Sequence, residues 1–137
     1  MSTLNVGTIK SLGSSAPVFQ NSSGVEKGQL ARAWVNFDGT GTVAIKDSFN
    51  VSSITDNGSG DYFITFAVAM PNKVYAVMLD HNHQNSNTRG VGLTGNADHS
   101  DNDYTTTGFR VTVERPDTNF GLGRSDCNRI CASIFGD

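Results

Sequence analysis

Hydrophobic and polar positions alternate with a period of two along most of the chain from residue 31 onward. Ala33, Val35 and Phe37 alternate with other residues, and Asp38-Gly39-Thr40-Gly41 then provides turn formers. The turn signal at Asp56-Asn57-Gly58-Ser59-Gly60 is the strongest in the chain. Further short apolar runs lie at 43–45, 49–54, 62–69, 74–79, 109–113 and 129–135. The pattern predicts roughly seven strands, which is typical of a β-sandwich.

The order of these runs predicts how the strands pair. The strands at 62–69 and 74–79 are apolar on both faces, so we expect both to be buried, with 62–69 in a central position. Short turns separate successive strands, which favours an antiparallel meander. The predicted fold is all-β, an antiparallel β-sandwich or jelly-roll-like domain with an extended N-terminal docking segment.

Residues 1–30 differ from the rest of the chain. Spaced apolar residues such as Leu4, Val6 and Ile9 lie in a background of Ser and Gly, too few to build a core of their own. We expect 1–30 to be an extended attachment segment on a larger partner, and 31–137 to be the β domain; the alternative is a flexible leader. The first ten residues have neither a basic start nor an apolar run, so we expect no secretory signal.

Residues 80–107 interrupt the alternation with a long polar stretch. Long polar loops in compact domains commonly carry function. This one contains Arg89, Asp101, Asp103 and Tyr104, a mixture suited to hydrogen bonding and stacking on a glycan. These four are the predicted receptor-binding residues, and we expect alanine at Arg89 or Tyr104 to weaken adsorption without lowering stability. The alternative is a mobile loop without a ligand.

Composition and charge exclude several classes of protein. Gly, Ser, Thr and Asn make up two-fifths of the chain, and strong helix formers are scarce, so a helical bundle is excluded. The net charge is −3, and the ten Lys and Arg residues are scattered, so we expect no nucleic-acid partner. No apolar run approaches the length of a membrane span, so we expect no membrane insertion.

The sequence also lacks a recognisable catalytic constellation. There is no Gly-x-Ser-x-Gly motif and no phosphate-binding glycine loop, and the only two glutamates are Glu26 and Glu114. We therefore expect the chain not to be an enzyme. Cys127 and Cys131 are too far apart on an extended strand to form a disulfide, so we expect two reduced thiols.

Two groups of residues are candidate metal ligands. His81 and His83 project to the same side of an extended segment, so three chains around an axis would present six imidazoles to one transition-metal ion. The alternative is a pair of solvated loop histidines, and no cofactor is otherwise expected. Oxygen ligands for Ca²⁺ occur at Asn96, Asp98, Asp101, Asn102 and Asp103, although their spacing does not follow an EF-hand loop.

One long segment is specific enough to suggest a family. The run RAWVNFDGTGTVAI at 32–45, its continuation SFNVSSITDNG at 48–58, and the words GDYFITF, AMP and YAV within 60–77 carry it. This segment resembles the C-terminal domain of tail-fibre-like virion proteins from bacteriophages, notably marine and cyanobacterial ones. The first residues, MSTL, also resemble that family, whereas 80–126 does not match it in detail.

The resemblance implies a homotrimeric virion protein made in the cytoplasm of the bacterial host. Residues 1–30 would attach it to other tail proteins, and the β domain would contact a host cell-surface glycan or protein. The alternative is a capsid or tail decoration protein without a receptor role. A third hypothesis, a glycan-cleaving enzyme, has no residue pattern in its favour.

Overall fold

The computed structural model describes residues 5–10, 17–82, 103–116 and 122–136. The chain divides into two compact units, Met1–Leu30 and Ala31–Asp137.

The first unit contains one small antiparallel hairpin. Strand β1 (Phe19–Gln20) pairs with β2 (Glu26–Gly28), and the Asn21 side-chain Oδ1 accepts the Ser23 and Val25 N–H groups in the turn. The large apolar residues described in this unit are all between 43% and 59% exposed: Val6, Ile9, Val18, Phe19, Val25 and Leu30. The described part of the unit therefore has no hydrophobic core.

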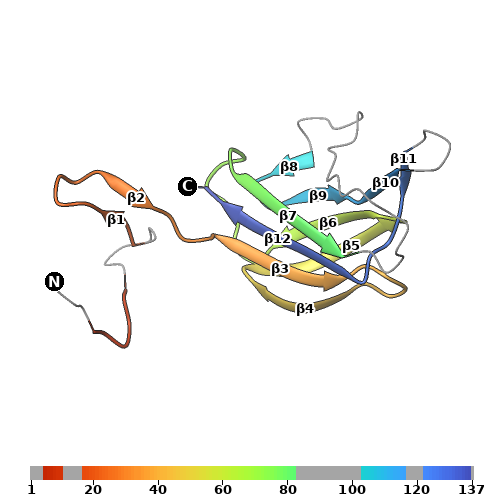
Figure 1. The fold of residues 1–137 in the computed structure, drawn as a ribbon, viewed down its shortest axis with the longest axis horizontal. Helices are drawn as coiled ribbons and strands as arrows, with labels where there is room; N and C mark the ends of the chain where they lie inside the picture. Colours follow the sequence, from red (N-terminus) through yellow and green to blue (C-terminus); the bar gives the residue numbers. More distant parts are fainter. Residues whose placement is uncertain (1–4, 11–16, 83–102, 117–121, 137) are drawn as a thin grey trace. The chain divides into compact units, whose positions relative to one another are not determined.

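The second unit is all-β and consists mainly of two four-stranded antiparallel sheets (Figure 1). The first sheet has the order β4-β3-β12-β7, with bounds Ala44–Phe49, Ala33–Asp38, Arg129–Phe135 and Ala76–Asn82. The second has the order β5-β6-β9-β8, with bounds Val51–Gly58, Asp61–Phe66, Gly108–Thr112 and Tyr104–Thr105. A hairpin of β10 (Glu114–Pro116) and β11 (Leu122–Arg124) completes the unit. The predicted all-β, sandwich-like class is confirmed.

The core consists of the inward side chains of the two sheets. Alternate residues of β3, β6, β9 and β12 are fully or almost fully buried, as the period of two predicts. The buried cluster comprises Ala33, Val35, Phe37, Tyr62, Ile64, Phe66, Met70, Phe109, Val111, Val113, Cys127, Ile130, Ala132 and Ile134. Each large apolar side chain in it contributes about 1.5–3 kcal/mol on burial, so this cluster is the main source of stability.

A corner at Asn50 sends the chain from the first sheet to the second. Asn50 has a φ of 54°, and it separates β4 from β5. Its side chain donates to the carbonyls of Arg32 and Val68 and accepts the Val68 N–H at 2.7 Å. The single strand predicted over 49–54 is therefore wrong. The alternation does not reveal the corner because Asn50 tolerates the left-handed conformation without a glycine or proline signal.

The position of β7 is the second correction. The pattern over 74–79 predicts a strand buried on both faces, but β7 begins only at Ala76 and lies at the edge of the first sheet. Met78 in this strand is 66% exposed, and Val74, which precedes it, is 82% exposed. The meander also breaks here, because the chain leaves β6 in the second sheet and enters the first sheet at β7. The central position predicted for the strand at 62–69 is correct, because β6 lies between β5 and β9. The predicted length is not, because β6 ends at Phe66 and Val68 is 70% exposed.

Candidate functional site

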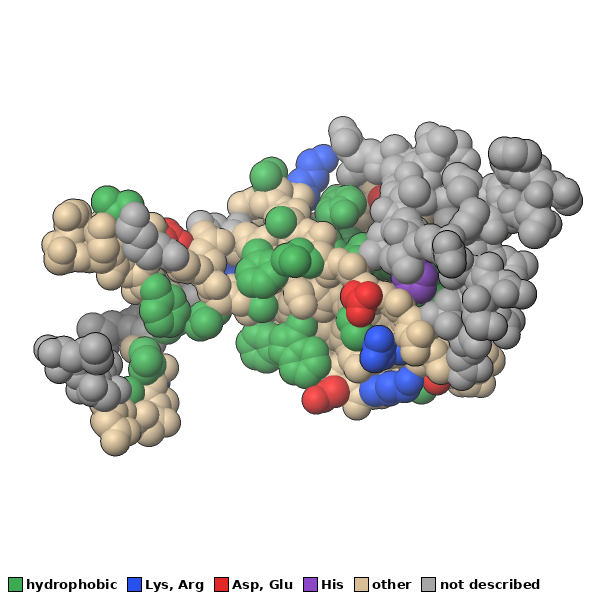
Figure 2. All heavy atoms as spheres, viewed as in Figure 1, with side chains coloured by type: hydrophobic (Ala, Val, Ile, Leu, Met, Phe, Trp, Pro, Cys, Tyr) green, Lys and Arg blue, Asp and Glu red, His purple; other side chains and the backbone are tan. Residues whose placement is uncertain are grey.

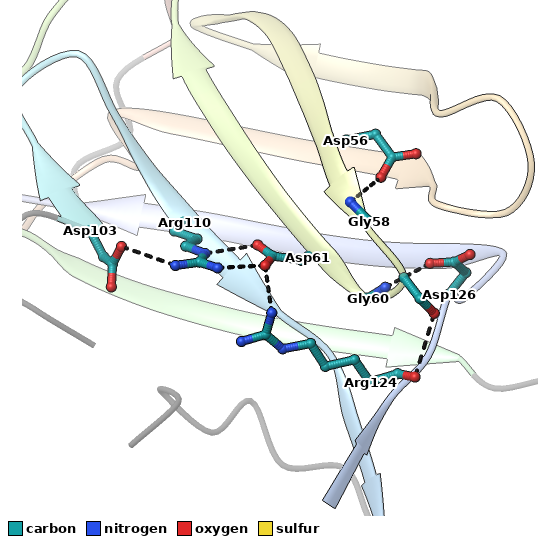
Figure 3. Close-up of polar contacts among 9 residues, drawn as sticks. Asp56, Gly58, Gly60, Asp61, Asp103, Arg110, Arg124 and Asp126 are labelled. Carbon is teal, nitrogen blue, oxygen red and sulfur yellow. Dashed lines mark hydrogen bonds and ion pairs between the residues drawn. The ribbon is translucent and has the colours of Figure 1, made fainter. Parts of the chain in front are cut away.

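A charge cluster lies on the outer face of the second sheet. Asp61 begins β6, and Arg110 lies in β9 between the core residues Phe109 and Val111, so its side chain projects away from the core. Arg110 binds the Asp61 carboxylate with two hydrogen bonds, from Nε at 2.8 Å and from Nη2 at 2.5 Å (Figure 3). Arg124, from β11, donates to the same carboxylate through Nη1 at 2.6 Å.

Asp61 is the centre of this cluster electrostatically. Its side chain is only 5% exposed, and the hydrogen bonds from Arg110, opposed by burial, hold the pKa of the carboxyl below its ordinary value. Asp61 in turn raises the pKa of the Arg110 guanidinium. Asp103 lies 3.7 Å from Arg110 Nη1, so two carboxylates balance two guanidiniums. The arrangement fastens β11 to the second sheet.

A second polar contact fixes the adjoining turn. The Asp126 carboxylate accepts the Gly60 N–H at 2.7 Å and the Tyr62 hydroxyl at 2.8 Å. Burial, followed by the hydrogen bond to Asp126, raises the pKa of the Tyr62 hydroxyl, which therefore remains a proton donor. These contacts join the start of β6 to the segment that precedes β12.

Tyr104 lies at the open end of an aromatic cluster. Its ring centroid is 5.4 Å from that of Tyr75 and 6.2 Å from that of Phe109, and the Phe66 ring lies 5.7 Å from both of these rings. The Tyr75 hydroxyl is 3.0 Å from both the Thr105 and the Gly108 carbonyl oxygens, and burial raises the pKa of Tyr75 to about 12. Tyr104 remains 37% exposed. A ring held rigidly by neighbours and open on part of its surface is suited to stacking on a flat ligand.

The structure separates two of the predicted receptor-binding residues. Tyr104 packs on the core residue Phe109, whereas Asp103 turns to Arg110 on the outer face and its side chain is only 14% exposed. Arg89 and Asp101 lie outside the described residues. Asp61, Arg110 and Arg124 are not among the predicted site residues. The sequence feature that could have identified Arg110 as a site residue is its charge at an outward position between the apolar residues of β9.

The metal predictions fall mostly outside the described residues. His81 lies in β7 and is 8% exposed, on the same side of the strand as Val77 and Leu79, while His83 is not described. Of the proposed calcium ligands only Asp103 is described. Cys127 and Cys131 are free thiols, and burial raises the pKa of the Cys127 thiol.

Part of the outer face of the first sheet is apolar. Phe49 pairs with Trp34 in the β4–β3 register, and Ser133 of β12 lies between Trp34 and Met78. Phe49 is 54% and Met78 66% exposed. With Phe135, these side chains form what we call the outer apolar face: Trp34, Phe49, Met78 and Phe135. Figure 2 shows hydrophobic side chains gathered on this side of the molecule. Exposed large apolar side chains gathered on one face are typical of an interaction site.

Among the residues that the structure describes, there is neither a helix long and apolar enough to cross a membrane nor a group of three side chains able to hold a metal ion. The resemblance to phage tail-fibre-like proteins rests on the words within 32–77 and the first residues. No protein-family model, curated protein or solved structure matches the chain.

Proposed function

We propose that this chain is a phage virion structural protein of the tail-fibre-like kind. In this proposal residues 1–30 attach it to other tail proteins, and the domain 31–137 presents a surface to the host cell. The observation that carries the proposal is the contrast between the two units: one has a complete core, and the other exposes every large apolar residue described in it.

The first unit needs a partner for energetic reasons. Its six exposed large apolar side chains would each gain about 1 kcal/mol on burial of their exposed half. The described part of the unit has no buried apolar residue to support it, and a two-stranded hairpin such as β1–β2 is too small to be stable alone in water. Attachment to a larger virion protein supplies the missing apolar contacts, which supports the docking function of residues 1–30.

Host recognition is proposed for the end of the second sheet that carries Tyr104. The exposed part of its ring suits stacking on a sugar, and the neighbouring segment supplies polar side chains, including Arg89 and Asp101. The Asp103 carboxylate already pairs with the Arg110 guanidinium, so its proposed role is to position Arg110 near the ligand. The proposed ligand is a host cell-surface glycan. The proposal includes no catalytic step, and a turnover assay on host polysaccharide tests whether the chain cleaves such a glycan.

A homotrimer is also proposed, and the outer apolar face supports it. Phe49 and Met78 are large, exposed and in line across the first sheet, so a second copy of this chain would remove them from water. Mass photometry of the full chain over a range of concentrations tests this proposal. We expect a trimer that Phe49→Ser weakens, with Val68→Ser, an exposed position outside this face, as the matched control. A concentration-independent monomer would rule the trimer out.

Immunogold labelling of virions tests the location. Label on the tail supports the proposal, and label on the head favours the alternative, a decoration protein without a receptor role.

A phage carrying Val6→Asp and Ile9→Asp should lose the protein from its particles, because both side chains are exposed and available to a partner. Ser23→Asp adds charge to the same unit without removing an apolar group and serves as the control. Normal incorporation of the double variant would contradict the docking function.

A further inference from the structure

Strand β5 ends, directly before the turn into β6, with the only Asn-Gly pair in the chain, Asn57-Gly58. Both residues are exposed, and Gly58 has a φ of 124°, a conformation that a side chain would strain. The Gly58 N–H donates to the Asp56 Oδ1 at 2.9 Å (Figure 3). The nitrogen that follows an asparagine is the group that attacks the asparagine side chain when an amide is lost spontaneously.

We propose that Asn57 is a site of spontaneous deamidation, and that its conversion places a new carboxylate beside Asp61. The Gly58 backbone nitrogen attacks Asn57 Cγ, a bond forms between them, and the Cγ–Nδ2 bond breaks. The nitrogen loses its proton, and the side-chain amide leaves as ammonia. Water then opens the five-membered succinimide at either carbonyl, which yields aspartate or isoaspartate at position 57. Water is the only co-reactant.

Asp56 assists the first of these steps. Its carboxylate already accepts the hydrogen of the attacking nitrogen, so it is placed to take up that proton. The absence of a side chain at Gly58 leaves the approach to Cγ open. Exposure of the turn gives water access to the succinimide.

The other acidic turn shows why the reaction is specific to Asn57. Asp38-Gly39 has the residue order that also permits a succinimide, but Gly39 is buried and its N–H is held by the Cys127 carbonyl at 2.8 Å. The Tyr62 hydroxyl lies 2.4 Å from where a Gly39 Cβ would be. Hydrogen bonds from Thr40 lower the pKa of Asp38, which keeps its carboxylate ionised and unreactive. That turn is therefore closed to the same chemistry.

Conversion of Asn57 changes the charge cluster. Asn57 precedes Gly58, which pairs with Asp61, and hydrogen bonding from the Asn57 side chain contributes to the lowered pKa of the Asp61 carboxyl. Aspartate at this position removes that donor and adds a negative charge beside a carboxylate that is 5% exposed. Isoaspartate also lengthens the backbone where Gly58 pairs with Asp61. Both products weaken the cluster through which Arg124 fastens β11 to the second sheet.

Mass spectrometric peptide mapping of the full chain, aged in mildly alkaline buffer, tests the reaction. Asn57 should convert at least about tenfold faster than Asn21 and Asn72, exposed turn asparagines that are followed by Ser22 and Lys73 instead of glycine. Asp56→Asn, which keeps an accepting oxygen but loses its basicity, should slow the conversion. Equal rates at the three asparagines would overturn the proposed site, and an unchanged rate in Asp56→Asn would overturn the role of Asp56.

The consequence has its own test. Asn57→Asp carries the product charge from the start, and it should lower the melting temperature by about 4 °C or more relative to Asn57→Gln, which keeps an amide. Asn21→Asp adds the same charge to an exposed turn in the first unit and should leave the melting temperature of the β domain unchanged. If Asn57→Asp and Asn57→Gln have the same melting temperature, the proposed coupling to Asp61 is wrong.

Discussion

Replacement of Asp61 by asparagine removes the charge at the centre of the cluster and keeps the side-chain shape. The carboxylate accepts three hydrogen bonds from two guanidiniums, those of Arg110 and Arg124. An asparagine presents an NH₂ group to one of these donors, so at least one contact becomes a clash between two donors. We expect Asp61→Asn to destabilise the β domain strongly.

The magnitude follows from burial. Removal of one partner of a buried ion pair costs about 3–5 kcal/mol, because a charge is left without compensation. Here the Arg110 and Arg124 side chains are 30% and 32% exposed, so water recovers part of the loss. We therefore expect about 3 kcal/mol, which corresponds to a fall of about 12 °C in the melting temperature of a domain of this size.

Urea denaturation of the full chain measures this loss. Asp80→Asn is the matched control, because Asp80 also faces an arginine, Arg129, but at 4.0 Å and with its side chain 70% exposed. That variant should stay within about 0.5 kcal/mol of the wild type. A loss in Asp61→Asn no larger than that of Asp80→Asn would refute the reasoning.

The pH dependence gives an independent check. Because the folded pKa of Asp61 lies below its ordinary value of 3.8, its contribution is complete above that pH and is lost as the pH falls through the folded value. The difference in unfolding free energy between wild type and Asp61→Asn should therefore be constant near neutral pH and shrink in acid. A difference that persists unchanged in strong acid would show that its origin is not the charge.

Three further predictions concern other parts of the domain. Gly60→Ala should cost about 3 kcal/mol in urea denaturation, because φ is +61° and the new Cβ would lie 2.6 Å from the Ser125 nitrogen. A maleimide should label Cys131 in the native protein and Cys127 only after unfolding, since Cys127 is 2% exposed and its thiol pKa is raised; intact mass reports both. Tyr104→Ala should lower the melting temperature and abolish binding on a glycan array, whereas Tyr104→Phe should retain both stability and stacking; retained binding in Tyr104→Ala would remove this ring from the receptor site.

The stability part of the Tyr104 prediction reverses the expectation from sequence. A tyrosine in a polar stretch is expected to be a loop residue. Its packing on Tyr75 and Phe109 could not be predicted, because it depends on which strands become neighbours. The alternation correctly predicts the buried positions of β3, β9 and β12, because inward and outward residues must differ wherever one face of a sheet is covered. It does not assign strands to sheets, since a period of two carries no information about the partner.

The same limit explains what the sequence does not reveal about the site. Asp61, Arg110 and Arg124 come from β6, β9 and β11, and only the pairing of β6 with β9 brings the first two together. Each residue alone is an ordinary surface charge. Asn50 is similar, because its side chain forms the corner by donating to the Arg32 carbonyl and accepting the Val68 N–H.

The central place of β12 in the first sheet has a consequence for synthesis. Ile134 pairs with Ala33, so the sheet cannot close until a strand near the far end of the domain has left the ribosome. The hairpins β3–β4 and β5–β6 need only local contacts and can form earlier. Until β12 inserts, β3 has an unpaired edge and β7 has no partner in the sheet, a state prone to aggregation. Nascent chains stalled before residue 129 should therefore depend on chaperones more than the finished domain does.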